Sequence, residues 1–209
     1  MSAADIHNLT LLGPAGSGKT TLVEAVALHF GAIERRGRVE DGNTLCDFQQ
    51  DEKEKQHSLA GAVVHLETSI GKLNVVDTPG YPDFIADAIT SMGAAGCAVL
   101  VVSARSGGGV PFHAFDLWRR ASALGLARAV VVTRLDGDNL NLTEEICGNR
   151  YGRSLVRPGG VIIWDDYVWD ERYPECEGVT RCVHEFQREH PIVRIAGTHH
   201  EPLSREEFL

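Results

Sequence analysis

The sequence predicts an α/β fold, a doubly wound and mostly parallel sheet with helices on both faces. Short apolar runs alternate with stretches in which apolar residues recur at three- and four-residue spacing. The runs 97–102 and Ala127–Thr133 have the character of strands that are buried on both faces. The chain has 209 residues, 43% hydrophobic and 23% charged, which suits one globular domain or one domain with an appendage and excludes global disorder.

The first elements follow from local pattern. Ile6–Leu12 is a short apolar strand that ends in a glycine-rich stretch. Residues 21–30 place apolar side chains at helical spacing, so we expect an amphipathic helix there. Residues 31–58 are polar and charged without clear periodicity, which predicts a long mobile loop.

The next elements alternate between strand and helix. Ala62–Thr68 and 72–77 are strand-like runs joined around a Ser-Ile-Gly turn, which predicts a hairpin. We expect a helix over 82–95, a buried strand over 97–102 and a second helix over 111–124, which has proline at its start. Ala127–Thr133 is the last well-defined strand.

The character of the chain changes after about residue 139. Periodicity is weak there, except at 161–164 and 192–195. We therefore expect a first domain over 1–140 and an atypical segment over 141–209. That segment is a divergent insertion, a rewired end of the domain, or a tail created by truncation or a shift of reading frame.

Charge and cysteine content limit the class of protein. The net charge is −9, so there is no basic footprint for nucleic acid and we expect no direct binding to DNA. The first seven residues carry no secretory leader, and the longest apolar stretch, 94–102, is too short to cross a membrane. Five scattered cysteines favour reduced thiols in the cytoplasm. The spacing Cys176, Cys182, His184 does not match common zinc-ligand pairs.

A phosphate-binding loop is the strongest motif. Two glycines separated by four residues are followed by Lys and Thr in Gly13-Pro14-Ala15-Gly16-Ser17-Gly18-Lys19-Thr20. Glycines allow backbone N–H groups to surround a phosphate, and the N-terminus of the next helix adds its positive dipole. Lys19 can reach the β- and γ-phosphates, and the Thr20 hydroxyl can ligate Mg²⁺. With Thr21, this stretch predicts a nucleotide site and a fold of the P-loop NTPase type.

Two later motifs complete the nucleotide site. Asp77-Thr78-Pro79-Gly80 follows a strand, where a carboxylate can orient the shell of Mg²⁺ and Gly80 N–H can approach the γ-phosphate. Thr133-Arg134-Leu135-Asp136 ends another strand. A carboxylate at 136 can accept two N–H groups from a guanine edge, which adenine does not offer, and the Arg134 side chain can lie over the base.

Residues 5–140 resemble the GTP-binding domain of translational GTPases, specifically elongation factor G and its elongation factor G-like branch. The resemblance rests on the three motifs, on 35–44, on 52–59, and on the sequence Asp-Thr-Pro-Gly-Tyr-Pro-Asp-Phe over 77–84. It implies Mg²⁺ ligation by Ser58, a second switch over 77–92, and a ribosome as partner. It also puts Tyr81 where the family has the histidine that positions the attacking water, so the implied catalytic set is Lys19, Gly80 and Tyr81.

The sequence departs from the common family pattern at several places. Thr133-Arg134 replaces Asn-Lys, and 55–57 read Lys-Gln-His instead of Arg-Gly-Ile. Tyr81 replaces histidine, although the elongation factor G-like branch also has tyrosine there, and no Ser-Ala-Lys-like segment follows residue 140. The favoured function is Mg²⁺-dependent binding and hydrolysis of GTP, with GDP as product. The alternative is a GTP-binding switch or truncated fragment with little or no turnover. Asp136 argues against an enzyme that uses ATP.

Overall fold

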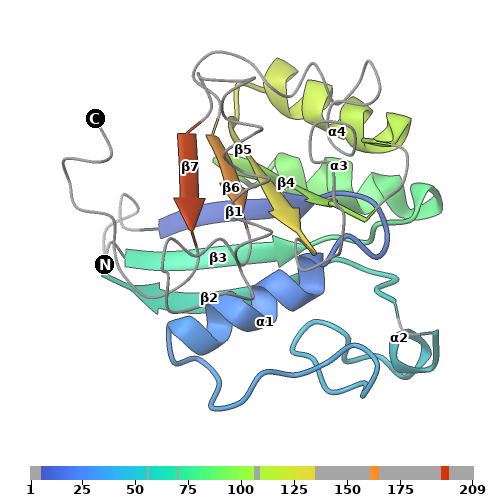
Figure 1. The fold of residues 1–209 in the computed structure, drawn as a ribbon, viewed down its shortest axis with the longest axis vertical. Coiled ribbons are helices and arrows are strands. Elements are labelled where there is room, and N and C mark those ends of the chain that lie inside the picture. Colours follow the sequence, from blue (N-terminus) through green and yellow to red (C-terminus); the bar gives the residue numbers. More distant parts are fainter. Residues whose placement is uncertain are drawn as a thin grey trace, which may run out of the picture. The chain divides into compact units, whose positions relative to one another are not determined.

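The computed structural model describes residues 6–55, 57–69, 71–105, 109–134, 161–164 and 194–197 (Figure 1). The chain divides into two compact units, and each is described by itself. The first consists of Met1–Val101 with Phe112–Arg128, and the second of Val102–Pro111 with Ala129–Leu209.

The first unit is built on four strands in the order β2-β3-β1-β4. These are β1 (Ile6–Leu12), β2 (Ala62–Thr68), β3 (Gly71–Asp77) and the greater part of β4 (Cys97–Ser103). β1 pairs in parallel with β3 and β4, and β2 pairs antiparallel with β3, which confirms the expected hairpin. β4 is buried from its second residue to its last, as its continuous apolar sequence requires.

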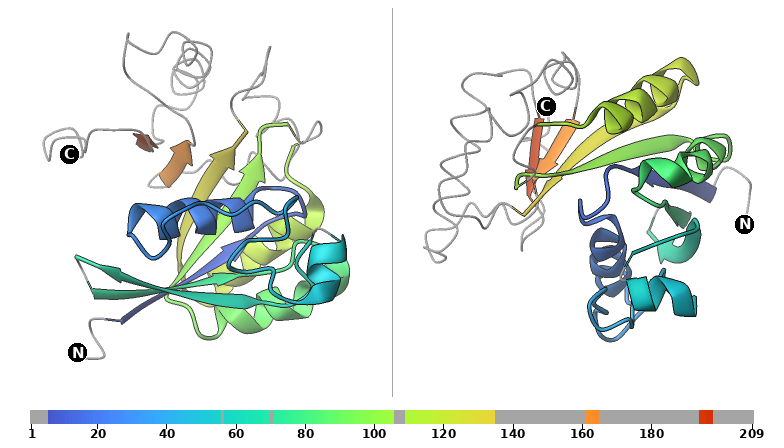
Figure 2. Two further views of the ribbon diagram at one scale, coloured as in Figure 1. Left: turned by 90° about the horizontal axis from the view of Figure 1, so that it is seen from below. Right: turned by 90° about the vertical axis from the view of Figure 1, so that its right-hand side faces the viewer.

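Helices cover both faces of this sheet, which confirms the doubly wound α/β class. α1 (Lys19–His29) contacts β3 on one face, and α3 (Ile85–Met92) and α4 (Phe112–Ala123) contact β1 on the other (Figure 2). Apolar side chains from these elements form the core: Leu11, Leu12, Val23, Ala27, Leu66, Val75, Ala88, Met92, Leu100 and Leu117. Among the described residues, no helix is long and apolar enough to cross a membrane.

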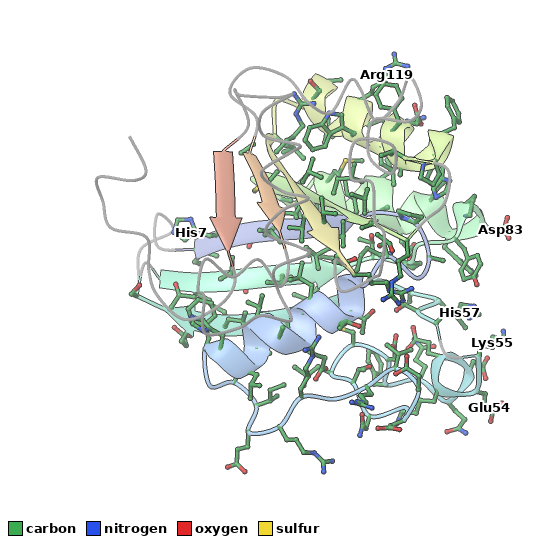
Figure 3. All side chains as sticks on the ribbon, viewed as in Figure 1. His7, Glu54, Lys55, His57, Asp83 and Arg119 are labelled. Atoms are coloured by element: carbon green, nitrogen blue, oxygen red, sulfur yellow. The ribbon has the colours of Figure 1, made fainter. Side chains whose placement is uncertain are left out.

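The expected loop over 31–58 contains a short helix, α2 (Gln50–Lys55). Glu52 accounts for it, because its buried carboxylate accepts the N–H groups of Gln49, Leu59 and Ala60. Figure 3 shows Glu54 and Lys55 pointing outward from the same helix. One inward carboxylate therefore fixes a helix that is too short to have a visible period.

Helix boundaries differ from the expected ones at two places. α1 begins at Lys19, two residues before the expected start, because Gly18 stands at its N-terminus in the left-handed conformation with φ 93°. The helix expected over 82–95 begins with a 3-10 turn, η2 (Pro82–Phe84), and its α-helical part ends at Met92. Beyond Met92, Gly93 and Ala94 donate three residues back, so the chain continues as turns rather than as α-helix.

The second unit contains the greater part of β5 (Ala127–Thr133), β6 (Val161–Trp164) and β7 (Arg194–Gly197), paired in parallel in that order. Within it, Ala104 N–H donates to Thr133 O at 2.9 Å. The expected boundary near residue 140 and the Cys176, Cys182 and His184 pattern lie outside the described residues, so both remain predictions.

Candidate functional site

The site forms at one edge of the sheet of the first unit. Leu11 of β1 stands opposite Asp77 of β3 in a parallel pair, so both strands end at the same edge. The loop 13–18 leaves β1 there and the turn 78–80 leaves β3 there. A parallel pair thus brings together two motifs that lie about sixty residues apart in the sequence.

The loop 13–18 has the backbone conformation that its glycines predicted. Gly13, Gly16 and Gly18 have φ of 143°, 72° and 93°. At Gly13 a Cβ atom would lie 2.2 Å from Val101 O, so no other residue fits there. Ser17 N–H donates to Pro14 O at 3.2 Å and closes the turn directly before α1.

Lys19, in the first turn of α1, folds back over this loop. Its Nζ donates to Gly13 O and to Pro14 O, each at 3.0 Å. The side chain is only 6% exposed, and burial lowers the pKa of Lys19 to about 8, against the opposing effect of the Asp77 charge. A buried ammonium group is therefore held against a loop whose N–H groups suit an anion.

Asp77 is the second buried charge of the site and is 1% exposed. Its Oδ2 accepts the Thr20 hydroxyl at 2.6 Å, while Oδ1 is buried without a nitrogen or oxygen donor among the described residues. Burial raises the pKa of Asp77 to about 6, although the Thr20 hydrogen bond and the Lys19 charge oppose this. A buried carboxylate oxygen without a donor, beside a hydroxyl, is a donor set that fits a small hard cation.

Gly80 lies directly against the loop 13–18. Ala15 N–H donates to Gly80 O at 3.0 Å. A Cβ atom at position 80 would lie 2.4 Å from Ala15 N and 2.6 Å from Lys19 Nζ. The next residue, Tyr81, is 43% exposed, and its ring centroid lies 4.8 Å from that of His57.

Ser58 is connected to Asp77 through a third residue, Asp47. Its hydroxyl donates to Asp47 Oδ1 at 2.7 Å. Asp47 is buried, and its negative charge contributes to the raised pKa of Asp77, so the two carboxylates are neighbours. Ser58 is thus linked to the site through Asp47 rather than by a direct contact.

Three residues of the site were missed from the sequence. The Cys46 thiol is buried near Asp77 and Asp47, and burial together with the charges of these two carboxylates raises its pKa. His113 on α4 has its pKa lowered by burial and by the Lys19 charge. Glu24, on α1, is a buried acid. Its position among apolar residues of the helix is the feature of the sequence that could have identified it.

The expected base-recognition residues belong to the second unit. Thr133 is buried at the end of β5, and its hydroxyl donates to Val102 O at 3.4 Å. Arg134 follows in the left-handed region, with φ 59°, and is exposed. Asp136 lies outside the described residues.

Residues 4–201 match the family described as "Elongation factor Tu GTP binding domain". An elongation factor G-like protein of Mycobacterium tuberculosis is 40% identical over 141 residues, 68% of this chain and 20% of that protein. A mitochondrial ribosome-releasing factor 2 of Candida albicans is 32% identical over 136 residues, 65% of this chain and 17% of that protein. A crystal structure of a protein from Thermus thermophilus aligns with TM-score 0.63 and 27% identity, over 94% of this chain and 38% of that one. This chain spans about a fifth of the length of these two curated relatives.

Proposed function

Because the chain belongs to the family of the elongation factor Tu GTP-binding domain, and its relatives include elongation factor G-like proteins, we propose that it binds GTP and GDP with Mg²⁺ and hydrolyses GTP. The observation that carries the proposal is the meeting of Lys19, Gly80 and the loop 13–18 at one sheet edge. This arrangement supports the binding of a nucleoside triphosphate with its terminal phosphate near Gly80.

In this proposal the chain holds the phosphates and orients one water. The N–H groups of the loop and the Lys19 ammonium bind the β- and γ-phosphates, and Gly80 N–H approaches the γ-phosphate. The water oxygen bonds to the γ-phosphorus while the bond from that phosphorus to the bridging oxygen breaks. The proton of the water passes to a phosphate oxygen, which gives GDP and inorganic phosphate. Tyr81, next to Gly80, sits near that water, and its hydroxyl can hydrogen-bond the water without acting as its base.

Magnesium fits the residues present at this edge. Thr20 and Asp77 would hold the ion, and the buried Asp77 Oδ1 without a nitrogen or oxygen donor among the described residues supports this assignment. Ser58 is assigned as a further ligand by family resemblance alone. When bound, the ion neutralises phosphate charge.

The proposed function includes recognition of the guanine base and a partner. Asp136 reads guanine, with Thr133 and Arg134 beside the base, on the strength of the motif in the sequence. The ribosome is the proposed partner because the relatives include a ribosome-releasing factor. The proposed location is the cytoplasm, because the relatives include an elongation factor G-like protein of the bacterium Mycobacterium tuberculosis.

A titration of the full chain with fluorescent GTP, GDP and ATP tests nucleotide binding. We expect guanine nucleotides to bind in preference to ATP, and chelation of Mg²⁺ to weaken the binding of GTP. Lys19→Ala should bind triphosphate much more weakly while its circular dichroism stays that of the parent. If the variant binds GTP as the parent does, the assignment of the phosphate loop is wrong.

A second candidate is a GTP-binding switch with very little turnover. The specific observation in its favour is Tyr81, which replaces the family's histidine and is 43% exposed. Single-turnover release of γ-phosphate, with and without ribosomes, separates the two functions. Release that stays near the uncatalysed rate even with ribosomes would favour the switch.

A further inference from the structure

Glu24 is a buried acid whose two carboxylate oxygens both contact the loop that follows α1. The residue is 1% exposed. Oε2 accepts Gly37 N–H at 2.7 Å, and Oε1 accepts Leu45 N–H. Hydrogen bonds from backbone N–H to a buried carboxylate are charge-assisted, and each is stronger than a neutral one. Glu24 therefore joins both ends of the segment 37–45 to helix α1.

The segment between these two contacts is closed on itself. Arg38 N–H donates to Asn43 Oδ1 at 2.7 Å, and Asp41 N–H donates to Arg38 O at 3.2 Å. The backbone at Gly37 lies so close to the backbone at Asn43 that a Cβ atom on Gly37 would lie 2.5 Å from Asn43 O. Because both ends of this closed loop meet the same side chain, the carboxylate sets the position of the whole segment.

Cys46 and Asp47, the two residues that follow Leu45, lie at the nucleotide site. Cys46 is buried and lies close enough to Asp77 for the charge of that carboxylate to raise the pKa of its thiol. Asp47 accepts the Thr44 hydroxyl at 3.1 Å and the Ser58 hydroxyl at 2.7 Å. The N–H group of Leu45, which Glu24 holds, therefore lies directly before Cys46 and Asp47. Of these two residues, Cys46 lies near Asp77 and Asp47 accepts the Ser58 hydroxyl.

We propose that Glu24 is a positioning residue of the nucleotide site, which holds the segment 37–47 so that Cys46 and Asp47 stand against Asp77 and Ser58. This inference rests on the proposed function. The Asp47 carboxylate adds negative charge beside Asp77, and that charge favours a divalent cation there. Loss of the Glu24 contacts moves Asp47 away, so Mg²⁺ is held less tightly and bound nucleotide leaves faster.

Four variants of the full chain separate this role from a general loss of structure. Glu24→Ala removes both contacts, whereas Glu24→Gln keeps one acceptor oxygen and should have an intermediate effect. Gly37→Ala opposes the same closure by a clash and leaves the carboxylate in place. Glu34→Ala is the matched control, since Glu34 is an exposed acid in the same loop. Circular dichroism and thermal unfolding check that each variant is folded.

The first measurement is the rate of alkylation at Cys46, found by peptide mass mapping, with Cys97 as the internal reference. Cys46 is 2% exposed, so its reaction requires the segment to open. We expect Glu24→Ala and Gly37→Ala to raise the ratio of the Cys46 rate to the Cys97 rate by about tenfold or more, because two charge-assisted bonds hold the segment closed. Glu34→Ala should leave the ratio unchanged.

The second measurement is the release rate of a fluorescent GDP analogue as a function of Mg²⁺ concentration. Glu24→Ala and Gly37→Ala should need a several-fold higher Mg²⁺ concentration for half-maximal retention than the parent and Glu34→Ala. An unchanged Cys46 ratio overturns the inference. A raised ratio with parental Mg²⁺ dependence also overturns it, because the segment would then be held without serving the site. A parent that binds no guanine nucleotide overturns the proposed function instead, and the alkylation ratio still decides whether Glu24 holds the segment.

Discussion

The Thr20 hydroxyl donates a hydrogen bond of 2.6 Å to Asp77 Oδ2 and so joins the first turn of α1 to the end of β3. The two side chains come from motifs 57 residues apart in the chain. Both are proposed magnesium ligands, and the bond holds the two candidate ligands within reach of one ion.

Thr20→Val should weaken the Mg²⁺ dependence of nucleotide binding, because valine keeps the shape of threonine but has no oxygen ligand. We expect a loss of roughly tenfold or more in Mg²⁺ affinity, comparable with the loss of other groups that orient a metal. Mg²⁺ titrations monitored by a fluorescent nucleotide measure it. Thr90→Val is the control, since the Thr90 hydroxyl bonds Ala86 O of its own helix. Equal Mg²⁺ affinity in both variants would exclude Thr20 as a ligand.

The affinity for GTP should fall as the pH rises above about 8. Burial lowers the pKa of Lys19 to about 8 in the free protein, and phosphate charge raises it in the complex. Below pH 8 the ammonium is already protonated, so affinity is constant. Above it, binding must take up a proton, and the affinity decreases by up to about tenfold per pH unit. Calorimetric titrations between pH 7 and 9 test this.

Lys19→Arg is the matched variant for that pH profile. A guanidinium group keeps its charge throughout the range, so its affinity, even if lower, should change much less with pH. Ionisation of the nucleotide itself affects both proteins alike and cancels in the comparison. Parallel profiles for parent and variant would mean that Lys19 is not the phosphate contact.

Gly80→Ala should abolish most nucleotide binding while leaving the fold intact. The added Cβ would lie 2.4 Å from Ala15 N and 2.6 Å from Lys19 Nζ, so the loop or the ammonium must move away from the phosphate position. Gly96→Ala is the control, because the nearest atom to its Cβ is Asn8 O at 3.9 Å. Fluorescent nucleotide titration and thermal unfolding of both variants measure the effect. Parental affinity in Gly80→Ala would remove position 80 from the phosphate site.

The glycine-rich turn over 13–18 could be predicted from the sequence because the motif that contains it lies in eight consecutive residues, while its role in binding phosphate stays a prediction. The strand before it, the helix after it and the hairpin over 62–77 follow equally from local pattern, and the structure confirms all three. The pairing of Thr20 with Asp77 was also within reach, since parallel strands that carry these motifs end at the same edge.

The role of Glu24 could not be predicted in this way. Its hydrogen-bond partners lie 13 and 21 residues further along, in a segment without periodicity. α2 was missed for a similar reason, because six residues show no helical period and the inward Glu52 is explained only by N–H groups outside the helix. Contacts from a side chain to the backbone of an irregular loop leave no regular spacing in the sequence.

Asp136→Asn should shift the preference of the protein from GTP towards xanthosine triphosphate. In the proposed function the carboxylate accepts two N–H groups of guanine, and each charge-assisted bond of this kind is typically worth ~1.5–3 kcal/mol. An amide presents a donor in place of one acceptor, which suits the O2 atom of xanthine. Competition between the two triphosphates for parent and variant measures the shift. Unchanged selectivity would mean that the base is read elsewhere.

Tyr81→Phe should cost little of the basal rate of GTP hydrolysis. A phenol can hydrogen-bond a water, but it is a weak general base in neutral solution, and orientation with electrostatics supplies most of the catalysis in phosphoryl transfer. Tyr81 is 43% exposed and packs beside His57, so its ring is not fixed over the phosphate site by burial. The isolated chain should therefore hydrolyse GTP very slowly, whether or not this hydroxyl is present.

Tyr81→His tests the same position by introducing a side chain that can act as a general base. An imidazole can both orient water and accept its proton, so it should restore some turnover, but only when a ribosome holds residues 77–92 in place. Release of γ-phosphate from parent, Tyr81→Phe and Tyr81→His, each with and without ribosomes, gives six rates to compare. Fast parental turnover without ribosomes that Tyr81→Phe abolishes would contradict a slow switch. In that case the Tyr81 hydroxyl itself would act on the attacking water, and the protein would be an efficient GTPase without its partner.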